Sequence, residues 1–276
     1  MDIIQAIIIG IVQGLTEFLP VSSSAHLIFA QNALGVESSL AFDVFHLGSL
    51  IAVLWFFRAD IIRMIQAFLL SIGDIIQHRF KEGFYSDPYK RLVWYVIIAT
   101  IPVGLVGVLF ESQVESLFAG ALYVPAFFLF VTGTILYLSQ RMNSGEVDLS
   151  NLSLKESIFM GLGQACAILP GLSRSGTTIA AGLVIGLDKE FAAKFSFILS
   201  IPAILGAFVV QLKDIGTITD FNALAVLFGF LAALISGYLA IKWLLELIQK
   251  RSLDIFAYYC WIVGIIVFMG SITHLF

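Results

Sequence analysis

The stretch QGLTEFLPVSSSAH, residues 13–26, contains the first of two breaks in a largely apolar sequence. It separates two apolar runs, 2–19 and 21–34, by a proline at position 20 followed closely by three serines. Proline breaks a helix, and a serine after the break is a typical helix N-cap. We therefore expect two helices joined at a polar tip. The second helix is too short to cross a bilayer alone, because a crossing takes about 20 apolar residues.

The composition shows which solvent surrounds these helices. Of the 276 residues, 59% are hydrophobic and only 12% are charged, with a mean hydropathy of +0.99. Soluble proteins carry about 25% charged residues. A chain this apolar needs lipid around much of it, which excludes a secreted enzyme and a disordered protein. The net charge of −4 gives no basic excess, so we expect no nucleic-acid partner. The two cysteines lie in apolar runs and indicate no disulfide or metal framework.

The rest of the chain predicts an all-α polytopic membrane protein in a single domain, 1–276. A second broken stretch, PGLSRSG at 170–176, separates the apolar runs 157–169 and 177–187. Each broken pair is either a re-entrant hairpin, which needs a buried or watery surrounding, or one kinked span. Six further segments are long and apolar enough to cross: 40–57, 92–110, 121–138, 191–212, 221–245 and 255–273.

Basic residues favour six transmembrane helices plus two re-entrant hairpins. The connection 58–91 holds six of the 15 basic residues and is expected on the cytoplasmic side. With both hairpins re-entrant, most other basic residues fall on that side as well. Lys213 alone is outside and Arg174 lies in a hairpin. Both termini are then outside, in a bacterial cytoplasmic membrane. Within the connection, 61–78 has the spacing of an amphipathic surface helix.

The two hairpins also suggest an inverted-topology repeat of residues 1–140 and 141–276. At an offset of 151 residues, glycine, glutamine and serine recur: Gly10 and Gly161, Gln13 and Gln164, Ser22 and Ser173, Ser24 and Ser175. Hairpins that enter from opposite sides bring their tips together near the bilayer centre. Inverted repeats typically carry a site at that interface.

Glu17, His26 and Arg174 are ionisable groups expected at membrane depth, where charge is costly, so each is a candidate functional residue. A structural alternative is that Glu17 only neutralises Arg174. Hydroxyls crowd the same two tips: Ser22, Ser23, Ser24, Ser173, Ser175, Thr177 and Thr178. Helix N-termini, serines and an arginine fork bind phosphate, although any single serine can serve only as a cap.

A carboxylate beside an anion site indicates a divalent cation between the two. Glu17, with an amide oxygen from Gln13 four residues earlier, is therefore the candidate metal site. His26 lies close enough to Ser23 in sequence to take a proton from it or from a water, or to be a packed core histidine. Asp43 and His46 are an i, i+3 pair that either supports the site or only packs.

These residues resemble a known family. QGLTEFLPVSSSAH (13–26) and PGLSRSGTT (170–178) are similar to the two signatures of the undecaprenyl-pyrophosphate phosphatases, also called bacitracin-resistance proteins. Length and span pattern agree from end to end. Two departures are visible: Gln13 stands where many members have Glu, and Ala25 stands where Gly often precedes the histidine.

The resemblance implies a membrane enzyme that releases phosphate from undecaprenyl pyrophosphate and requires Mg²⁺ or Ca²⁺. It makes Glu17, with Gln13, the metal- or pyrophosphate-coordinating element, and His26 with Ser23 the proton-transfer and nucleophilic groups. Arg174 clamps phosphate with Ser173 and Thr178; Ser22 and Ser175 are further candidate substrate-binding residues. Attack by Ser23 and attack by water both stay open. A transporter or lipid flippase is the rival function, since it shares the same architecture, and a scaffold protein would leave the buried charges unexplained.

Overall fold

The computed structural model describes residues 1–276 except 37–38, 119–121, 143–144, 212–221, 251 and 274–276. Within the described residues the chain is all-helical, apart from one isolated bridge between Val147 and Leu187. The helices are α1 Ile3–Phe18, α2 Ser23–Leu34, α3 Ser39–Phe56, α4 Arg58–Ile76, α5 Phe80–Ser86, α6 Pro88–Phe118, α7 Tyr123–Ser139, α8 Leu154–Cys166, α9 Arg174–Val184, α10 Lys189–Gln211, α11 Ala223–Lys250 and α12 Asp254–Ile272.

Among the described residues, four helices are long and apolar enough to cross a membrane: α10, α11, α12 and the part of α6 from Pro88 to Phe110. They cover most of four of the six expected spans and make this a multi-pass membrane protein. The expected span 121–138 is α7, an apolar helix of 17 residues. The expected number of six crossings stays a prediction, and residues 121, 212, 213 and 221, Lys213 among them, lie outside the described residues.

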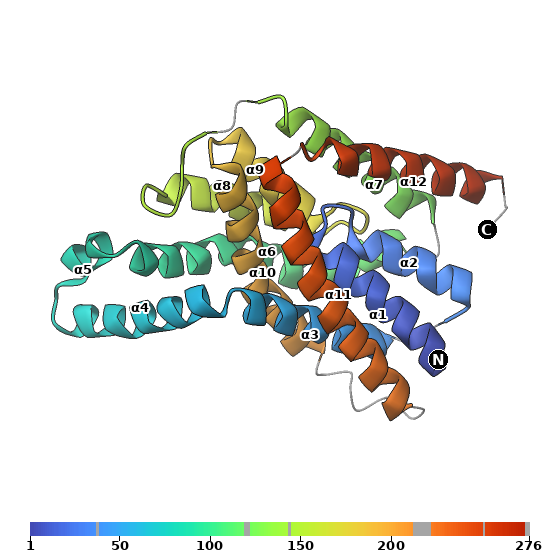
Figure 1. Ribbon diagram of the computed structural model, residues 1–276, viewed down its shortest axis with the longest axis horizontal. Coiled ribbons are helices and arrows are strands. Elements are labelled where there is room, and N and C mark those ends of the chain that lie inside the picture. Colours follow the sequence, from blue (N-terminus) through green and yellow to red (C-terminus); the bar gives the residue numbers. More distant parts are fainter. Residues whose placement is uncertain (37–38, 119–121, 143–144, 212–221, 251, 274–276) are drawn as a thin grey trace.

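The expected span 40–57 is α3, which turns by 83° at Phe57 into α4. Residues 61–76 of the expected amphipathic segment 61–78 belong to α4, which leaves apolar side chains such as Ile65 and Leu69 exposed. Figure 1 shows α4 and α6 running side by side away from the centre, joined through α5. Whether α4 lies on a membrane surface stays a prediction.

Both helix–break–helix stretches are present. α1 ends at Phe18 and α2 begins at Ser23, while α8 ends at Cys166 and α9 begins at Arg174. The helix expected at 177–187 begins three residues early, because Ser173 caps it by accepting a hydrogen bond from the Gly176 N–H at 3.0 Å. The cap fixes where the first helical turn can start.

The helix starts follow the offset of 151 residues seen in the sequence. α1 and α8 begin at Ile3 and Leu154, and α2 and α9 begin at Ser23 and Arg174. The caps correspond as well: α1 and α8 both start with a capping box, and α2 and α9 are both capped by a serine side chain. The same local rules therefore form both hairpins.

Each hairpin packs on a long helix from the other half of the chain. α1 lies against α11, and α8 lies against α6. At both contacts a glycine allows the helices to approach: a Cβ on Gly10 would lie 2.1 Å from the carbonyl oxygen of Gly229, and one on Gly161 would lie 2.3 Å from that of Ala99. α7 and α12 also lie side by side (Figure 1), and so do α3 and α11.

These glycines generate a prediction about stability. Gly10→Ala and Gly161→Ala are each expected to destabilise the protein, because overpacking a close contact costs about 1–3 kcal/mol, more than alanine gains in helix propensity. Tryptophan fluorescence during thermal unfolding in detergent measures the effect. Gly104→Ala in α6 is the matched control, since a Cβ there meets no atom within 4 Å. Unchanged midpoints in both test variants would contradict the close packing.

Candidate active site

The two hairpins touch at their tips. The Ser175 hydroxyl at the start of α9 donates to the carbonyl oxygen of Leu19 at 3.0 Å, and the Gly171 N–H donates to the Ser24 hydroxyl at 3.1 Å. Both contacts join residues about 150 positions apart in the chain. The expected meeting of the two broken stretches is therefore present in the structure.

A threonine from α7 braces the second tip. The Thr132 hydroxyl donates to the carbonyl oxygen of Gly171 and accepts from the Ser173 N–H, at 3.1 and 3.0 Å. Gly171 adopts a φ of +98°, and a Cβ on it would lie 2.3 Å from the carbonyl oxygen of Pro125. Only glycine fits this turn, which sets the position of α9 and hence of Arg174.

Arg174 and Glu17 form an ion pair where the tips meet. The Nη2 of Arg174 donates to the Oε1 of Glu17, whose side chain is only 4% exposed. The other carboxylate oxygen, Oε2, accepts from the Nε2 of Gln13 at 3.0 Å and lies 3.8 Å from the Nε2 of His46. Of the three ionisable residues expected at membrane depth, Glu17 and Arg174 therefore form an ion pair. This pair is compatible both with a working site and with mutual neutralisation.

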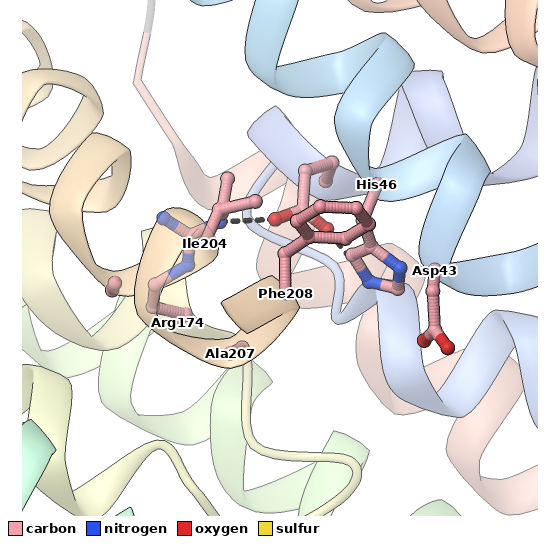
Figure 2. Close-up of a pocket in the computed structure, with 8 residues that line it drawn as sticks. Asp43, His46, Arg174, Ile204, Ala207 and Phe208 are labelled. Atoms are coloured by element: carbon pink, nitrogen blue, oxygen red, sulfur yellow. Dashed lines mark hydrogen bonds and ion pairs between the residues drawn. The ribbon is translucent and has the colours of Figure 1, made fainter. Parts of the chain in front are cut away.

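The pair lines a cavity of about 190 Å³. Figure 2 shows Arg174 on one side of it and His46 with Asp43 on the other. The remaining wall is apolar and comes from α10, through Ala203, Ile204, Ala207 and Phe208. Asp43 and His46 therefore lie at the site.

A second cavity, of about 330 Å³, shares Glu17, His46 and Arg174 with the first. Its wall includes the start of α2, with the serines 22–24, and the second tip from Pro170 to Leu172. Ser23 lines this cavity together with Glu17. Glu17, Ser23 and Arg174, three of the four candidate catalytic residues, are therefore gathered in one place.

Ser22 holds a strained backbone. Its φ is +68°, a conformation that favours glycine, while its hydroxyl caps α2 by accepting from the Ala25 N–H at 3.4 Å. Its carbonyl oxygen bonds the Nδ1 of His26 at 2.8 Å. Strain of this kind persists where the surroundings impose it, often at functional sites.

His26, the fourth candidate catalytic residue, is turned elsewhere. Its Nε2 bonds the hydroxyl of Tyr259 on α12 at 2.8 Å, and the two rings stack with centroids 5.6 Å apart. His26 is not among the described residues that line either cavity. The structure thus brings the backbone of His26 to the first tip but directs its imidazole to α12.

The other candidate substrate-binding hydroxyls bond the protein itself. Ser173 caps α9, Ser175 bonds Leu19, and the Thr178 hydroxyl lies 2.5 Å from that of Ser196 on α10. Ser22 and Ser24 line the second cavity, and their hydroxyls lie 3.1 Å apart. The serines and threonine of the second tip therefore build the site, and their direct contact with substrate stays a prediction.

Gln13 and Glu17 fit a divalent cation in their chemistry. The Oε1 of Gln13 is buried and has no hydrogen-bond partner among the described residues, while the Nε2 of the same amide donates to the Glu17 carboxylate. Magnesium commonly takes one or two carboxylates and completes its ligands with phosphate oxygens and water. Within the described residues no group of three or more His, Cys, Asp or Glu could hold a metal alone. Such a site would therefore need oxygens from a bound phosphate.

Sequence reasoning missed several residues that position these groups. Ser49 hydrogen-bonds Gln13 at 3.5 Å, Thr132 braces the second tip, Ser196 bonds Thr178, and Tyr259 holds His26. Each lies in a mainly apolar helix that also holds other polar side chains. Their sequence offers no spacing that distinguishes them from other isolated hydroxyls.

Comparisons with known proteins agree with this geometry. The family described as "Bacitracin resistance protein BacA" matches residues 6–266. A protein of Methanobrevibacter smithii named undecaprenyl-diphosphatase is 99% identical over the full length of both chains. Proteins of the same name from Methanosphaera stadtmanae and Alkaliphilus metalliredigens are 47% and 41% identical, covering 99% of this chain and 99% and 100% of their own. Because the family model matches residues 6–266 and these relatives align over almost the whole chain, this chain belongs to the bacitracin resistance protein BacA family.

Proposed function

We propose that this chain is an integral-membrane phosphatase that hydrolyses undecaprenyl pyrophosphate to undecaprenyl phosphate and inorganic phosphate. The observation that carries the proposal is the Glu17–Arg174 pair at the junction of the hairpin tips, inside a cavity. The relatives named undecaprenyl-diphosphatase support the proposal, since their matches cover 100% and 99% of this chain.

The cavity has two kinds of wall, and the substrate has two kinds of surface. Arg174 and His46 offer polar donors to a pyrophosphate, and Glu17 offers a carboxylate to a cation bound with it. The α10 wall around Ile204 and Phe208 offers apolar contact to the first part of a polyprenyl chain. A soluble anion would need only the first wall. This combination favours a lipid pyrophosphate.

Catalysis of phosphoryl transfer depends mainly on positioning and charge neutralisation. Arg174 would bind the terminal phosphate through its planar fork of donors, exchanging Glu17 for phosphate oxygens. Ser23, beside Glu17, is the proposed nucleophile or the residue that positions a water. His26 is the proposed proton-transfer group. For that role the imidazole must give up its hydrogen bond to the Tyr259 hydroxyl and bond the reacting group instead.

Glu17 and the Oε1 of Gln13 would hold Mg²⁺ or Ca²⁺, which neutralises charge on the phosphate oxygens. The unpartnered Gln13 oxygen supports this assignment. Ser22, Ser173, Ser175 and Thr178 are proposed to hold the tips in the geometry that the phosphate requires. Their capping and tip-to-tip bonds support this role.

We further propose that the chain consists of inverted repeats, 1–140 and 141–276, in a cytoplasmic membrane with both termini outside. The matched helix starts and the packing of each hairpin on the other half support the repeat. The basic residues of the connection 58–91 support the orientation.

The function is tested by phosphate release from undecaprenyl pyrophosphate by purified protein in detergent, where no second compartment exists. We expect release that stops when a chelator is added and returns with Mg²⁺ or Ca²⁺. A transporter would release no phosphate in detergent but would move substrate into liposomes, and that result would replace the proposed function.

Arg174→Lys is expected to lose activity by about a hundredfold or more, because a point charge cannot reproduce a fork of donors at a phosphate. Initial rates of phosphate release measure the loss. Arg141→Lys is the matched control: Arg141 pairs with Asp254 at 3.1 Å, outside both cavities. A rate near that of the parent protein in Arg174→Lys would show that Arg174 is not the clamp.

Gln13→Glu is expected to lower the Mg²⁺ concentration needed for half-maximal activity by about tenfold, because a second carboxylate raises affinity for a divalent cation. Titration of activity against free Mg²⁺ measures the shift. Gln5→Glu, in the same helix but at its exposed start, is the control. An unchanged titration midpoint in Gln13→Glu would remove Gln13 from the metal site.

A further inference from the structure

Gln164 on α8 has a deeply buried side-chain amide. The residue is only 1% exposed, and among the described residues neither its Oε1 nor its Nε2 has a hydrogen-bond partner. Burying an amide unpaired costs free energy that most proteins avoid. The same residue lines the second cavity together with Glu17, Arg174 and the serines 22–24. The amide therefore lies in the wall of the candidate active site.

The counterpart of Gln164 explains why its amide is unpaired. Gln13 occupies the matching place on α1, and its Nε2 donates to Glu17, one turn later, at 3.0 Å. One turn after Gln164 the chain has Ile168, which also lines the cavity. The second hairpin thus keeps the glutamine but has no carboxylate to hold it. Its N–H groups are left for another acceptor.

We propose that Gln164 is a substrate-binding residue whose Nε2 donates a hydrogen bond to an oxygen of the pyrophosphate. This inference rests on the proposed function. A neutral amide suits this place, since it adds a donor to the phosphate without repelling Arg174 or a cation at Glu17. Gln13 and Gln164 then have different tasks: the first holds the carboxylate and the second holds the substrate.

The test compares Gln164→Met and Gln164→Glu with the parent protein. Methionine keeps the length and removes both polar atoms, while glutamate keeps the shape and replaces the donor by an anion. We expect KM for undecaprenyl pyrophosphate to rise about tenfold in Gln164→Met with kcat little changed, the size of one hydrogen bond to a charged group. Gln164→Glu is expected to lose about a hundredfold in kcat/KM through repulsion of the phosphate.

A binding measurement without turnover separates this role from a structural one. Inorganic pyrophosphate with Mg²⁺ should raise the unfolding midpoint of the parent protein in detergent, and the rise should shrink in Gln164→Met. The midpoint without pyrophosphate should stay the same or increase, because an unpaired amide is removed. Gln140→Met is the matched control, since among the described residues Gln140 also has a buried Nε2 without a hydrogen-bond partner but lies outside both cavities.

The outcomes distinguish this inference from the proposed function. If the parent protein releases no phosphate, the proposed function fails. If it releases phosphate while Gln164→Met keeps its KM and its full response to pyrophosphate, Gln164 does not bind substrate. A lowered midpoint in Gln164→Met with unchanged KM would make Gln164 structural. If Gln164→Met does not fold, Gln164→Glu decides, and an unchanged KM in that variant overturns the inference.

Discussion

The buried ion pair between Glu17 and Arg174 requires the two hairpin tips to lie together. A carboxylate this deeply buried needs a positive partner, because removing one member of such a pair leaves an uncompensated charge. The partner lies 157 residues away on the other hairpin. The two tips must therefore meet, and the contacts of Ser175 with Leu19 and of Gly171 with Ser24 keep them together.

Packing outside the tips serves the same requirement. A hairpin whose second helix is too short to cross a bilayer needs contacts with other helices to fix its position. The first helix of each hairpin therefore lies against a long helix of the other half, α1 on α11 and α8 on α6. Glycine at Gly10 and Gly161 lets these helices approach closely, which is typical of membrane proteins. The site is thus fixed by contacts between halves.

The sequence predicted the helical fold, both breaks and the meeting of Glu17 with Arg174, because proline, capping serines and buried charges act through local or very strong interactions. It missed the bracing by Thr132 and the stacking of His26 on Tyr259. These depend on which apolar helix lies beside each tip. A threonine or tyrosine in an apolar run does not indicate which residue will lie beside it in the folded protein. The contact of Thr178 with Ser196 was likewise not predictable from sequence spacing, whereas capping by a serine at the second break was expected.

Under the proposed function, the ion pair would also couple substrate binding to cation binding. Arg174 holds Glu17 in the structure, yet a phosphate with two or more negative charges competes for the same guanidinium donors. When Arg174 turns to phosphate, the buried carboxylate of Glu17 loses its main positive partner, and His46 at 3.8 Å neutralises it only if protonated. A divalent cation held by Glu17 would remove this penalty. Under the proposed function, the residue that secures the resting fold is therefore also the one that makes phosphate and metal bind together.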